Sequence, residues 1–248
     1  MAIELWTAPT PNGWKVSIMI EELKALGIAL PPLELYTVDL LNGQQFSDAF
    51  TAINPNQRIP ALRHDGRCIF ESGAILNYLG DTFPSSLLPA DSQRWQVLPW
   101  VYWQVANLGP AFGNKLSYTR YMDDVEPIQK KHPLERFNKE AQRLLGILDT
   151  RLSAHDFICG DEYTIADIAT WPWVRGWKWS KIDITPHEHV VQWVRRVRAR
   201  PAVEKGIAYG APQGESDQWS QETKARYQRL GTSMASNRPS KNKDSGDS

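Results

Sequence analysis

The feature that most constrains the fold of this chain is a change of hydrophobic period about a third of the way along it. Before residue 84, short strand patterns alternate with helical ones, whereas from Gln93 onward the apolar residues recur almost throughout at helical spacing. The segment between them carries Pro84 and Pro89 around a Ser/Leu run and is typical of a linker. We therefore predict an α/β domain at 1–84, a linker at 85–92 and an all-α domain at 93–212.

Within residues 1–84 the expected order of elements is β-α-β, an irregular helical connection, and then β-β-α. Asp65 and Gly66 stand between two short strand patterns and form a favoured two-residue hairpin turn, so this part of the sheet should be antiparallel. The predicted elements are an opening strand, a helix with apolar positions from Val16 to Leu26, a strand over 33–40, a hairpin of 61–64 with 67–70, and a helix over 72–83.

From residue 93 the apolar spacing predicts helices over 93–121, 127–153, 165–179, 187–199 and 202–209. Thr164 and Asp167 form a capping-box pattern that fixes the start of one helix, and we interpret this pair as structural rather than catalytic. Residues 213–248 are polar and are expected to be largely disordered. Within them we predict one amphipathic helical patch at Thr223–Leu230 and disorder from Ser233 to Ser248.

The composition argues against several classes of function. The 28 basic and 28 acidic residues balance, so no excess of charge favours nucleic acid or an anionic membrane surface. No apolar run is long enough to span a membrane, and no leader pattern opens the sequence. Cys68 and Cys159 match no metal or redox spacing, and the five histidines show no ligand spacing. We therefore expect a cytoplasmic protein that binds no metal, nucleic acid or membrane.

The opening of the chain is the first segment that indicates chemistry. A strand-like run enters a turn rich in Thr, Pro, Asn and Gly, and a helical pattern follows at once. Thr10 and Asn12 are thereby placed at a helix N-terminus, where free N–H groups and the helix dipole favour an anion. If that anion is a thiolate, its pKa is lowered and the sulfur becomes reactive. The alternative is an ordinary turn in which both side chains only cap the helix.

Two further segments complete a candidate site for a short peptide. Pro60 opens the third strand, and a cis Ile59–Pro60 bond would turn the backbone of Ile59 outward to pair with an extended ligand. Glu71 and Ser72 stand at the start of another helix, as a carboxylate and a hydroxyl beside free N–H groups. Glu71 suits a ligand ammonium, and Ser72 with its helix N-terminus suits an adjacent carboxylate. The three segments together predict a site for a peptide that carries both charges.

With these segments in place, the chain resembles the cytosolic glutathione transferases over about residues 1–210. The shared features are the thioredoxin-like β-α-β-α-β-β-α order, the Ile-Pro pair before the third strand, the Glu-Ser pair and the capping box. Within that superfamily, the segments 7–15, 43–46 and 168–173 resemble the Nu class and the Ure2p-like fungal and bacterial proteins. The resemblance implies an α/β thioredoxin-like N-terminal domain that binds glutathione, followed by an all-α C-terminal domain.

The resemblance also implies a set of glutathione contacts that spans both domains. Thr10 and Asn12 match the residues near the sulfur, and Arg136 matches an arginine that reaches a second glutathione or the disulfide. Alternatives stay open for Gln45, which can be a polar turn residue, and for Arg136, which can lie on a solvated helix face. The other implied contacts are the glycyl end for Gln45, ligand carboxylates for Lys15 and Arg58, backbone pairing for Ile59, and the γ-glutamyl group for Glu71 and Ser72.

One departure from related families sets the class of mechanism. Glutaredoxin-like and omega-class transferases carry a cysteine where this chain has Asn12, and many other classes carry Ser or Tyr. Asn12 can donate a hydrogen bond to a thiolate, but it has no proton to lose and cannot attack. The nucleophile is therefore expected to be the sulfur of glutathione, which is a substrate, so that no cofactor is needed. Cys68 and Cys159 are expected to be structural.

The resemblance implies a homodimeric, glutathione-dependent enzyme of detoxification or redox metabolism. Its partners would be glutathione, glutathione disulfide and a small electrophile, peroxide or disulfide. Conjugation to electrophiles is the leading reaction, with reduction of disulfides or peroxides as its companion. The alternative is a Ure2p-like regulatory or ligand-binding protein without turnover, because tryptophan-rich walls suit ligand binding equally well. The tryptophans expected in those walls are Trp100, Trp103, Trp171, Trp173 and Trp177.

Overall fold

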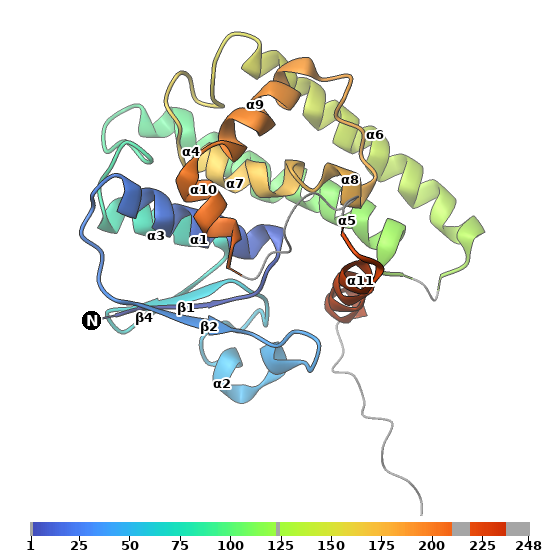
Figure 1. Ribbon diagram of the computed structural model, residues 1–248, viewed down its shortest axis with the longest axis horizontal. Helices are drawn as coiled ribbons and strands as arrows, with labels where there is room; N and C mark the ends of the chain where they lie inside the picture. The colour runs from blue at the N-terminus through green and yellow to red at the C-terminus, as the bar shows by residue number, and fades with distance from the viewer. Residues whose placement is uncertain (1, 123–124, 210–218, 237–248) are drawn as a thin grey trace, which may run out of the picture.

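The computed structural model describes residues 2–122, 125–209 and 219–236. A four-stranded sheet lies beside a body built of helices (Figure 1). Its strands are β1 (Ile3–Thr7), β2 (Leu33–Thr37), β3 (Ala61–His64) and β4 (Arg67–Phe70), in the order β2-β1-β3-β4. β1 pairs in parallel with β2 and antiparallel with β3, and β3 pairs antiparallel with β4. Asp65 and Gly66 both have positive φ angles, as the predicted hairpin turn requires.

Helices cover both faces of the sheet. α1 (Pro11–Ala25) and α3 (Ser72–Thr82) lie between the sheet and the helical body, whereas the short α2 (Asp48–Thr51) lies on the opposite face (Figure 1). The main hydrophobic core joins α1 and α3 to the helical body, and a smaller cluster that includes Val38, Phe50 and Ala61 lies around α2. A 3-10 turn, η1 (Gln44–Phe46), precedes α2. The N-terminal end of α1 therefore lies between the sheet and the helical body.

Every strand of the described residues lies before residue 71, so the predicted fold class is confirmed. One difference is a π-helical turn, η2 (Gln104–Leu108), within the predicted helix 93–121. Another is a break at Gly176 within the predicted helix 165–179, because glycine has a lower helix propensity than every other residue except proline. The helical body consists of α4 (Arg94–Trp103), η2 (Gln104–Leu108), α5 (Gly109–Arg120), α6 (Pro127–Leu152), α7 (Ile165–Val174), α8 (Trp177–Ser180), α9 (Glu188–Arg198) and α10 (Pro201–Ile207).

The two halves are joined through α1 and α10, which lie side by side. A Cβ atom on Gly206 would come within 2.6 Å of Ile18 Cα, so the close approach of these helices requires glycine. The carboxylate of Glu22, which is buried, accepts two hydrogen bonds from Arg200, each 2.7 Å long. A buried bidentate pair of this kind fixes the two halves relative to each other.

The C-terminal segment contains a helix longer than the predicted Thr223–Leu230 patch. α11 spans Gln221–Ser236, so residues 233–236, which were expected to be disordered, are helical. The reason is tertiary packing: Met234 packs against the small cluster around α2, and Ser233 Oγ donates to the Leu40 carbonyl at 2.7 Å. The rest of the predicted disordered tail, at 213–218 and 237–248, lies outside the described residues.

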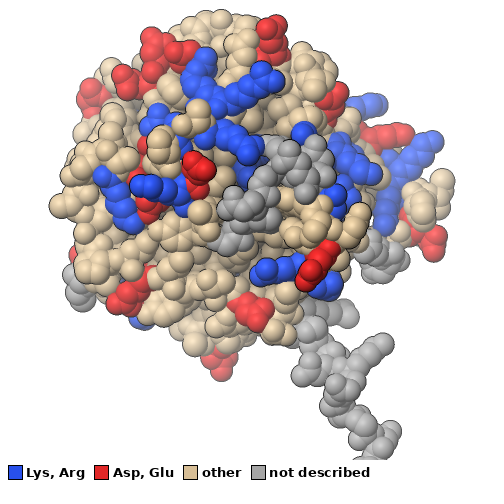
Figure 2. Space-filling model, in the orientation of Figure 1, with Lys and Arg blue, Asp and Glu red and all other residues tan. Residues whose placement is uncertain are grey.

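Both kinds of charge occur on the face seen in Figure 2. Lys and Arg side chains gather on its upper and right-hand parts with Asp and Glu side chains among them, and its lower part carries few charges. In the part of the chain that the structure covers, none of the helices has the length and apolar character needed to cross a membrane.

Candidate active site

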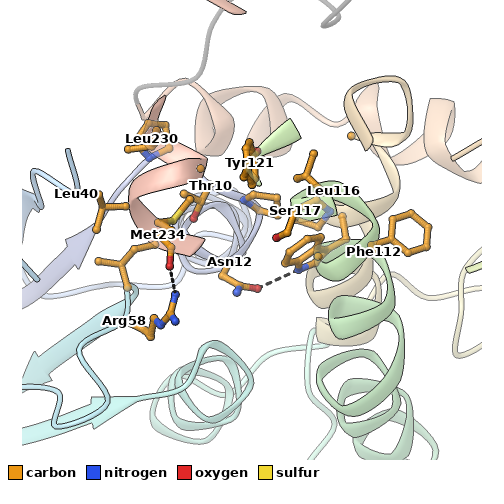
Figure 3. Close-up of a pocket in the computed structure, with 18 of the residues that line it drawn as sticks. Thr10, Asn12, Leu40, Arg58, Phe112, Leu116, Ser117, Tyr121, Leu230 and Met234 are labelled. Atoms are coloured by element: carbon orange, nitrogen blue, oxygen red, sulfur yellow. Dashed lines mark hydrogen bonds between the residues drawn. The ribbon is translucent and has the colours of Figure 1, made fainter. Parts of the chain in front are cut away.

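A pocket of about 590 Å³ opens between the sheet domain and the helical body (Figure 3). Its polar wall comes from the N-terminal ends of α1 and α3 and from the loop before β3, and its opposite wall comes from α5, α7, α8 and α11. Seven of the eight predicted site residues line this pocket: Thr10, Asn12, Gln45, Arg58, Ile59, Glu71 and Ser72.

Thr10 and Asn12 have different roles at the start of α1. Thr10 caps the helix, because its Oγ1 accepts a hydrogen bond from the Gly13 N–H at 3.2 Å. A Cβ atom on Gly13 would lie 2.2 Å from the Ala8 carbonyl oxygen, so this tight turn requires glycine. Asn12 Oδ1 instead accepts from Trp173 Nε1 at 3.0 Å (Figure 3). Since an indole N–H can only donate, the Asn12 carbonyl oxygen faces Trp173, which leaves the Nδ2 group as the donor for a ligand.

Glu71 lies directly before α3 in a strained backbone conformation. Its φ is 70°, a region that residues with a Cβ atom rarely adopt, and such outliers cluster at functional sites. Asn56 Nδ2 donates to Glu71 Oε1 at 3.4 Å. The exposed Glu71 carboxylate and the buried Ser72 hydroxyl therefore stand next to each other at the N-terminus of α3, on the wall that also carries Asn12.

Lys15 does not line the pocket but lies behind it. Its side chain is buried, and Nζ donates to Ser72 Oγ at 3.2 Å and to Gln104 Oε1 at 2.6 Å. Burial lowers the pKa of Lys15 to about 7, although the nearby Glu71 carboxylate acts to raise it. The ammonium group thus reaches the pocket only through Ser72.

The loop before β3 is held by Asn54, a buried side chain. Its Nδ2 donates to the Arg58 carbonyl at 2.5 Å, and its Oδ1 accepts from the Asn56 N–H at 2.8 Å. The Ile59–Pro60 bond is cis, as predicted. The Arg58 side chain reaches toward α11, where Nη1 donates to the Met234 carbonyl at 3.1 Å (Figure 3).

Gln45 is a buried residue of the pocket wall rather than a polar turn residue on the surface. Its side chain is 3% exposed, and its Oε1 finds no hydrogen-bond partner among the described residues. Buried polar groups are nearly always paired, so an orphaned amide oxygen beside a pocket indicates a position kept for a ligand or a water.

Arg136 is the predicted site residue that the structure does not bring to this pocket. It lines a separate hollow of about 600 Å³ between α5 and α6, together with His132, Lys139 and Arg143. Asn114 lines both hollows, so α5 separates Arg136 from the residues at the start of α1. The contact of Arg136 with a second glutathione or with the disulfide therefore stays a prediction, and Arg136 lies apart from the other seven residues.

The aromatic wall differs from the prediction. Of the five expected tryptophans, Trp173 lines the pocket, whereas Trp171 is fully buried in the core. The sequence did not predict the aromatic lining residues Phe112 of α5, Trp179 of α8 and Tyr227 of α11. It also did not predict Tyr121, Arg175 and Trp219, which lie in the segments next to these helices. Burial raises the pKa of Tyr121 to about 12, so its hydroxyl stays protonated at neutral pH. The amphipathic patch at Thr223–Leu230 indicated a helix there, but the polar composition of the C-terminal segment did not indicate that this helix lines the pocket.

Both cysteines lie away from the pocket. Cys68 is exposed on β4, and Cys159 is half-buried in the loop before α7. Burial raises the pKa of Cys159 to about 12, which leaves it a protonated and unreactive thiol. Across residues 2–122, 125–209 and 219–236, no three His, Cys, Asp or Glu side chains are grouped so that they could hold a metal ion.

The fold and this pocket define a class of protein that comparison with known sequences identifies. Residues 1–81 match the N-terminal domain of glutathione S-transferases and residues 109–201 match their C-terminal domain. The chain therefore belongs to the glutathione S-transferase family.

Several relatives in this family are similar along most of their length. The disulfide-bond oxidoreductase YghU of Escherichia coli is 39% identical, over 82% of this chain and 73% of its own. The disulfide-bond oxidoreductase YfcG of the same organism is 37% identical, over 83% of this chain and 94% of its own. The protein URE2 of Candida albicans is 27% identical, over 79% of this chain and 67% of its own.

Two solved structures of similar proteins contain ligands. A glutathione transferase family member from Pseudomonas fluorescens, with two glutathione molecules bound, is 36% identical with a TM-score of 0.76, over 83% of this chain and 92% of its own. A glutathione transferase from Pseudomonas putida, with one glutathione disulfide bound per subunit, is 35% identical with a TM-score of 0.74, over 83% and 90%.

Proposed function

We propose that this protein is a glutathione transferase that binds glutathione or its disulfide in the pocket between its two domains. The observation that carries the proposal is the grouping of Thr10 and Asn12, at the start of α1, with Glu71 and Ser72, at the start of α3, on one wall. Two helix N-termini on the same wall favour two anionic groups of one ligand. A glutathione thiolate and the carboxylate of its γ-glutamyl residue meet that requirement.

The proposed binding mode follows from the charges of the wall. Glu71 takes the γ-glutamyl ammonium, and Ser72 donates to the adjacent carboxylate. The backbone of Ile59 pairs with the middle residue of the peptide, while Gln45 and Arg58 serve the glycyl end. These assignments place the sulfur at the N-terminus of α1.

The proposed chemistry uses the sulfur of glutathione as nucleophile. Asn12 Nδ2, the Thr10 hydroxyl and the N-terminal N–H groups of α1 stabilise the thiolate. In conjugation the thiolate attacks an electrophilic carbon, a carbon–sulfur bond forms, and the leaving group departs with the electron pair of the bond that breaks. The protein itself contributes donors and position rather than a covalent intermediate, and glutathione is a substrate, so no cofactor is needed.

We further propose reduction of disulfides and peroxides by two molecules of glutathione. One thiolate attacks a disulfide and releases a thiolate; a second glutathione then attacks the mixed disulfide, which yields glutathione disulfide and the other thiol. With a hydroperoxide, the first attack gives glutathione sulfenic acid and an alcohol, and the second glutathione gives the disulfide and water. The names of the two Escherichia coli relatives and the two-glutathione Pseudomonas fluorescens structure support this companion activity.

A homodimer is proposed from apolar side chains left on the surface. Trp95 and Tyr102 on α4 are 71% and 63% exposed, and Ile128 on α6 is 77% exposed. Burying such residues against a second copy would remove them from water. We also propose that the protein is of the Nu or Ure2p-like type, on the motif around Asn12 and on the similarity to the YghU, YfcG and URE2 proteins, and that it is cytoplasmic. Sedimentation at micromolar concentration tests the dimer.

Turnover and binding assays test the proposed function. We expect glutathione-dependent turnover with at least one member of a panel of small electrophiles, a hydroperoxide and a disulfide. Glu71→Ala and Ser72→Ala should each weaken glutathione binding by about 1–3 kcal/mol in calorimetry, because each leaves a charged ligand group without a hydrogen bond. Tight binding of glutathione without turnover of any substrate would instead favour the regulatory or ligand-binding alternative.

A further inference from the structure

Lys15 is a buried cation whose hydrogen-bond partners are both neutral. The residue is 1% exposed, and Nζ contacts the Ser72 hydroxyl and the Gln104 side-chain carbonyl rather than a carboxylate. Charged side chains are almost never fully buried unless they are paired, because the loss of hydration is costly. The site therefore holds a cation prepared for an anion that the protein does not supply in direct contact.

The position of Gln104 suits its contact with Lys15. It lies fully buried at the start of the π-helical turn η2, and such turns inside α-helices are frequent at functional sites. Its Oε1 can only accept a hydrogen bond, so one N–H of Lys15 always points at Gln104. The Gln104 Nε2 has no partner within the described part of the chain. The second contact, with Ser72, is the one whose direction depends on the charge of Lys15.

The Ser72 hydroxyl is oriented by the protonation state of Lys15. A charged ammonium has no lone pair, so Ser72 Oγ must accept from it and the Ser72 proton is directed to another acceptor. A neutral amine has a lone pair and can accept the Ser72 proton itself. The charged form therefore always keeps the Ser72 O–H available for a ligand carboxylate at the N-terminus of α3, whereas the neutral form competes for that proton.

We propose that Lys15 is the buried counter-ion of the ligand's γ-glutamyl carboxylate, acting through Ser72, and that binding of a glutathione-type ligand takes up a proton on Lys15. Lys15 is a positioning residue in this scheme, because Ser72 makes the direct contact. The inference rests on the proposed function, since it assumes that the carboxylate of the ligand lies at Ser72.

The electrostatics of the surroundings support this coupling. Burial lowers the pKa of Lys15 to about 7 in the unliganded protein, and Glu71 is the charged group that acts to raise it. Of the elements packed on α1, α3 carries Asp81, which pairs with Arg94, and α10 carries Glu204 and Lys205, which are both exposed. α7 carries Asp167, whose carboxylate accepts from Ile158, Thr164 and Trp193, and η2 carries no charged residue. On α1 itself, Glu22 pairs with Arg200 of the segment before α10. A carboxylate placed on Ser72 would raise the pKa of Lys15 above its unliganded value.

The direction of the pH effect follows from the difference between the pKa of Lys15 without ligand and its pKa with ligand. Below the unliganded pKa of about 7, Lys15 is charged with or without ligand and affinity is highest. Above it, binding must take up a proton, so affinity falls as pH rises toward the pKa of the liganded state. We expect uptake of about half a proton per site at pH 7 and nearly one at pH 8, and an affinity about tenfold lower at pH 8 than at pH 6.

Calorimetry with S-methylglutathione measures this uptake without interference from the thiol proton. Titrations at pH 7 and pH 8 are carried out in buffers of different ionisation enthalpy, and the dependence of the observed heat on the buffer gives the number of protons taken up. The wild-type measurement requires no variant. Lys15→Met should bind with no proton uptake, with an affinity that hardly changes between pH 6 and 8.

Gln104→Glu is the second variant, in case Lys15→Met does not fold. It places a carboxylate 2.6 Å from Nζ, which keeps Lys15 charged before the ligand arrives, so binding should persist while proton uptake is lost. Lys115→Met is the matched control, because Lys115 on α5 is a second lysine whose pKa burial lowers, and it does not line the pocket. Its proton uptake should equal that of the wild type.

The outcomes separate this inference from the proposed function. S-methylglutathione that binds without proton uptake in the wild type, or uptake that persists in both Lys15→Met and Gln104→Glu, overturns the inference and leaves the proposed function standing. A wild-type protein that does not bind S-methylglutathione at all overturns the proposed function and the inference with it.

Discussion

The indole N–H of Trp173 donates to the side-chain carbonyl of Asn12 at 3.0 Å, across the boundary between the two domains. Trp173 lies on α7, and a Cβ atom on Gly113 of α5 would lie 3.2 Å from its ring, so the indole has little room to move. The helical domain thereby fixes which end of the Asn12 amide faces the pocket. A residue at the start of α1 therefore depends for its orientation on a residue 161 positions away in the chain.

Removing this bond should impair the reaction more than binding. Trp173→Phe keeps an aromatic ring but loses the N–H, so the Asn12 amide is free to turn its oxygen toward the sulfur. We expect kcat with glutathione to fall roughly five- to tenfold with little change in KM, and the apparent pKa of the pH–rate profile to rise. Trp177→Phe, outside the pocket, is the control. A Trp173→Phe enzyme with a wild-type pH–rate profile would exclude this role.

Two substitutions at Asn12 test whether the reaction needs the hydrogen-bond donor of its side chain or only a side chain of that size. Asn12→Asp still accepts from Trp173 but has no N–H to offer the sulfur and adds a negative charge beside it, so it should lower kcat more than Asn12→Ala does. Asn12→Ala should cost about 1–3 kcal/mol of transition-state stabilisation, and Thr10→Ala less. Steady-state rates and circular dichroism measure both effects. Equal rates in all three variants and the wild type would leave the dipole and N–H groups of α1 as the only activators.

A protein without cysteine should retain its glutathione-dependent activity. Neither Cys68 nor Cys159 lines the pocket, and the high pKa of Cys159 keeps its thiol protonated. The Cys68→Ser, Cys159→Ala double variant should therefore turn over substrates at a rate within about twofold of the wild type, since each change lies outside the site. A folded double variant without activity would show that a protein thiol takes part.

The sheet domain and most of its site could be predicted because their signals are local. The Asp65-Gly66 turn fixes the hairpin, the Thr10 cap starts α1, and Glu71 immediately precedes α3. Each of these residues is placed by backbone geometry within a few positions, so the sequence pattern carries the information.

The parts that could not be predicted depend on contacts between distant segments. The pairing of Lys15 with Gln104 joins positions 89 apart, and Gln104 lies in a π-helical turn that the apolar spacing does not reveal. In the sequence, Arg136 stands among charged residues in a segment with helical spacing. That pattern does not reveal that α5 lies between Arg136 and the pocket. α11 is polar overall and gains its place from packing on α5 and on the cluster around α2.

The capping box should contribute stability rather than activity. Asp167 is fully buried, and its carboxylate accepts from the Ile158 N–H at 3.0 Å, the Trp193 indole at 2.9 Å and the Thr164 N–H at 3.1 Å. Asp167→Ala leaves these donors unpaired and should lower the free energy of unfolding by about 3–5 kcal/mol in urea. Asp183→Ala, which removes an exposed carboxylate bonded to Thr185, should lower the free energy of unfolding far less than Asp167→Ala does.

The helix α11 forms a wall of the pocket that a single methyl group should displace. A Cβ atom on Gly231 would lie 2.1 Å from the ring carbons of Tyr121, so Gly231→Ala forces α11 away from α5. Because α11 contributes Tyr227, Leu230 and Met234 to the pocket, its displacement should widen the space for the second substrate. We expect the ratio of kcat/KM for a bulky over a small electrophile to rise about three- to tenfold, from relief of steric overlap worth about 1 kcal/mol.

Gly146→Ala is the control for this change, because a Cβ atom there, on helix α6, meets nothing within 4 Å. It should leave the ratio unchanged, and both glycine variants should unfold cooperatively, as α11 packs on the surface of the core rather than within it. An unchanged ratio in Gly231→Ala, together with unchanged hydrogen exchange in α11, would mean that Tyr121 gives way instead and that α11 does not limit the size of the second substrate.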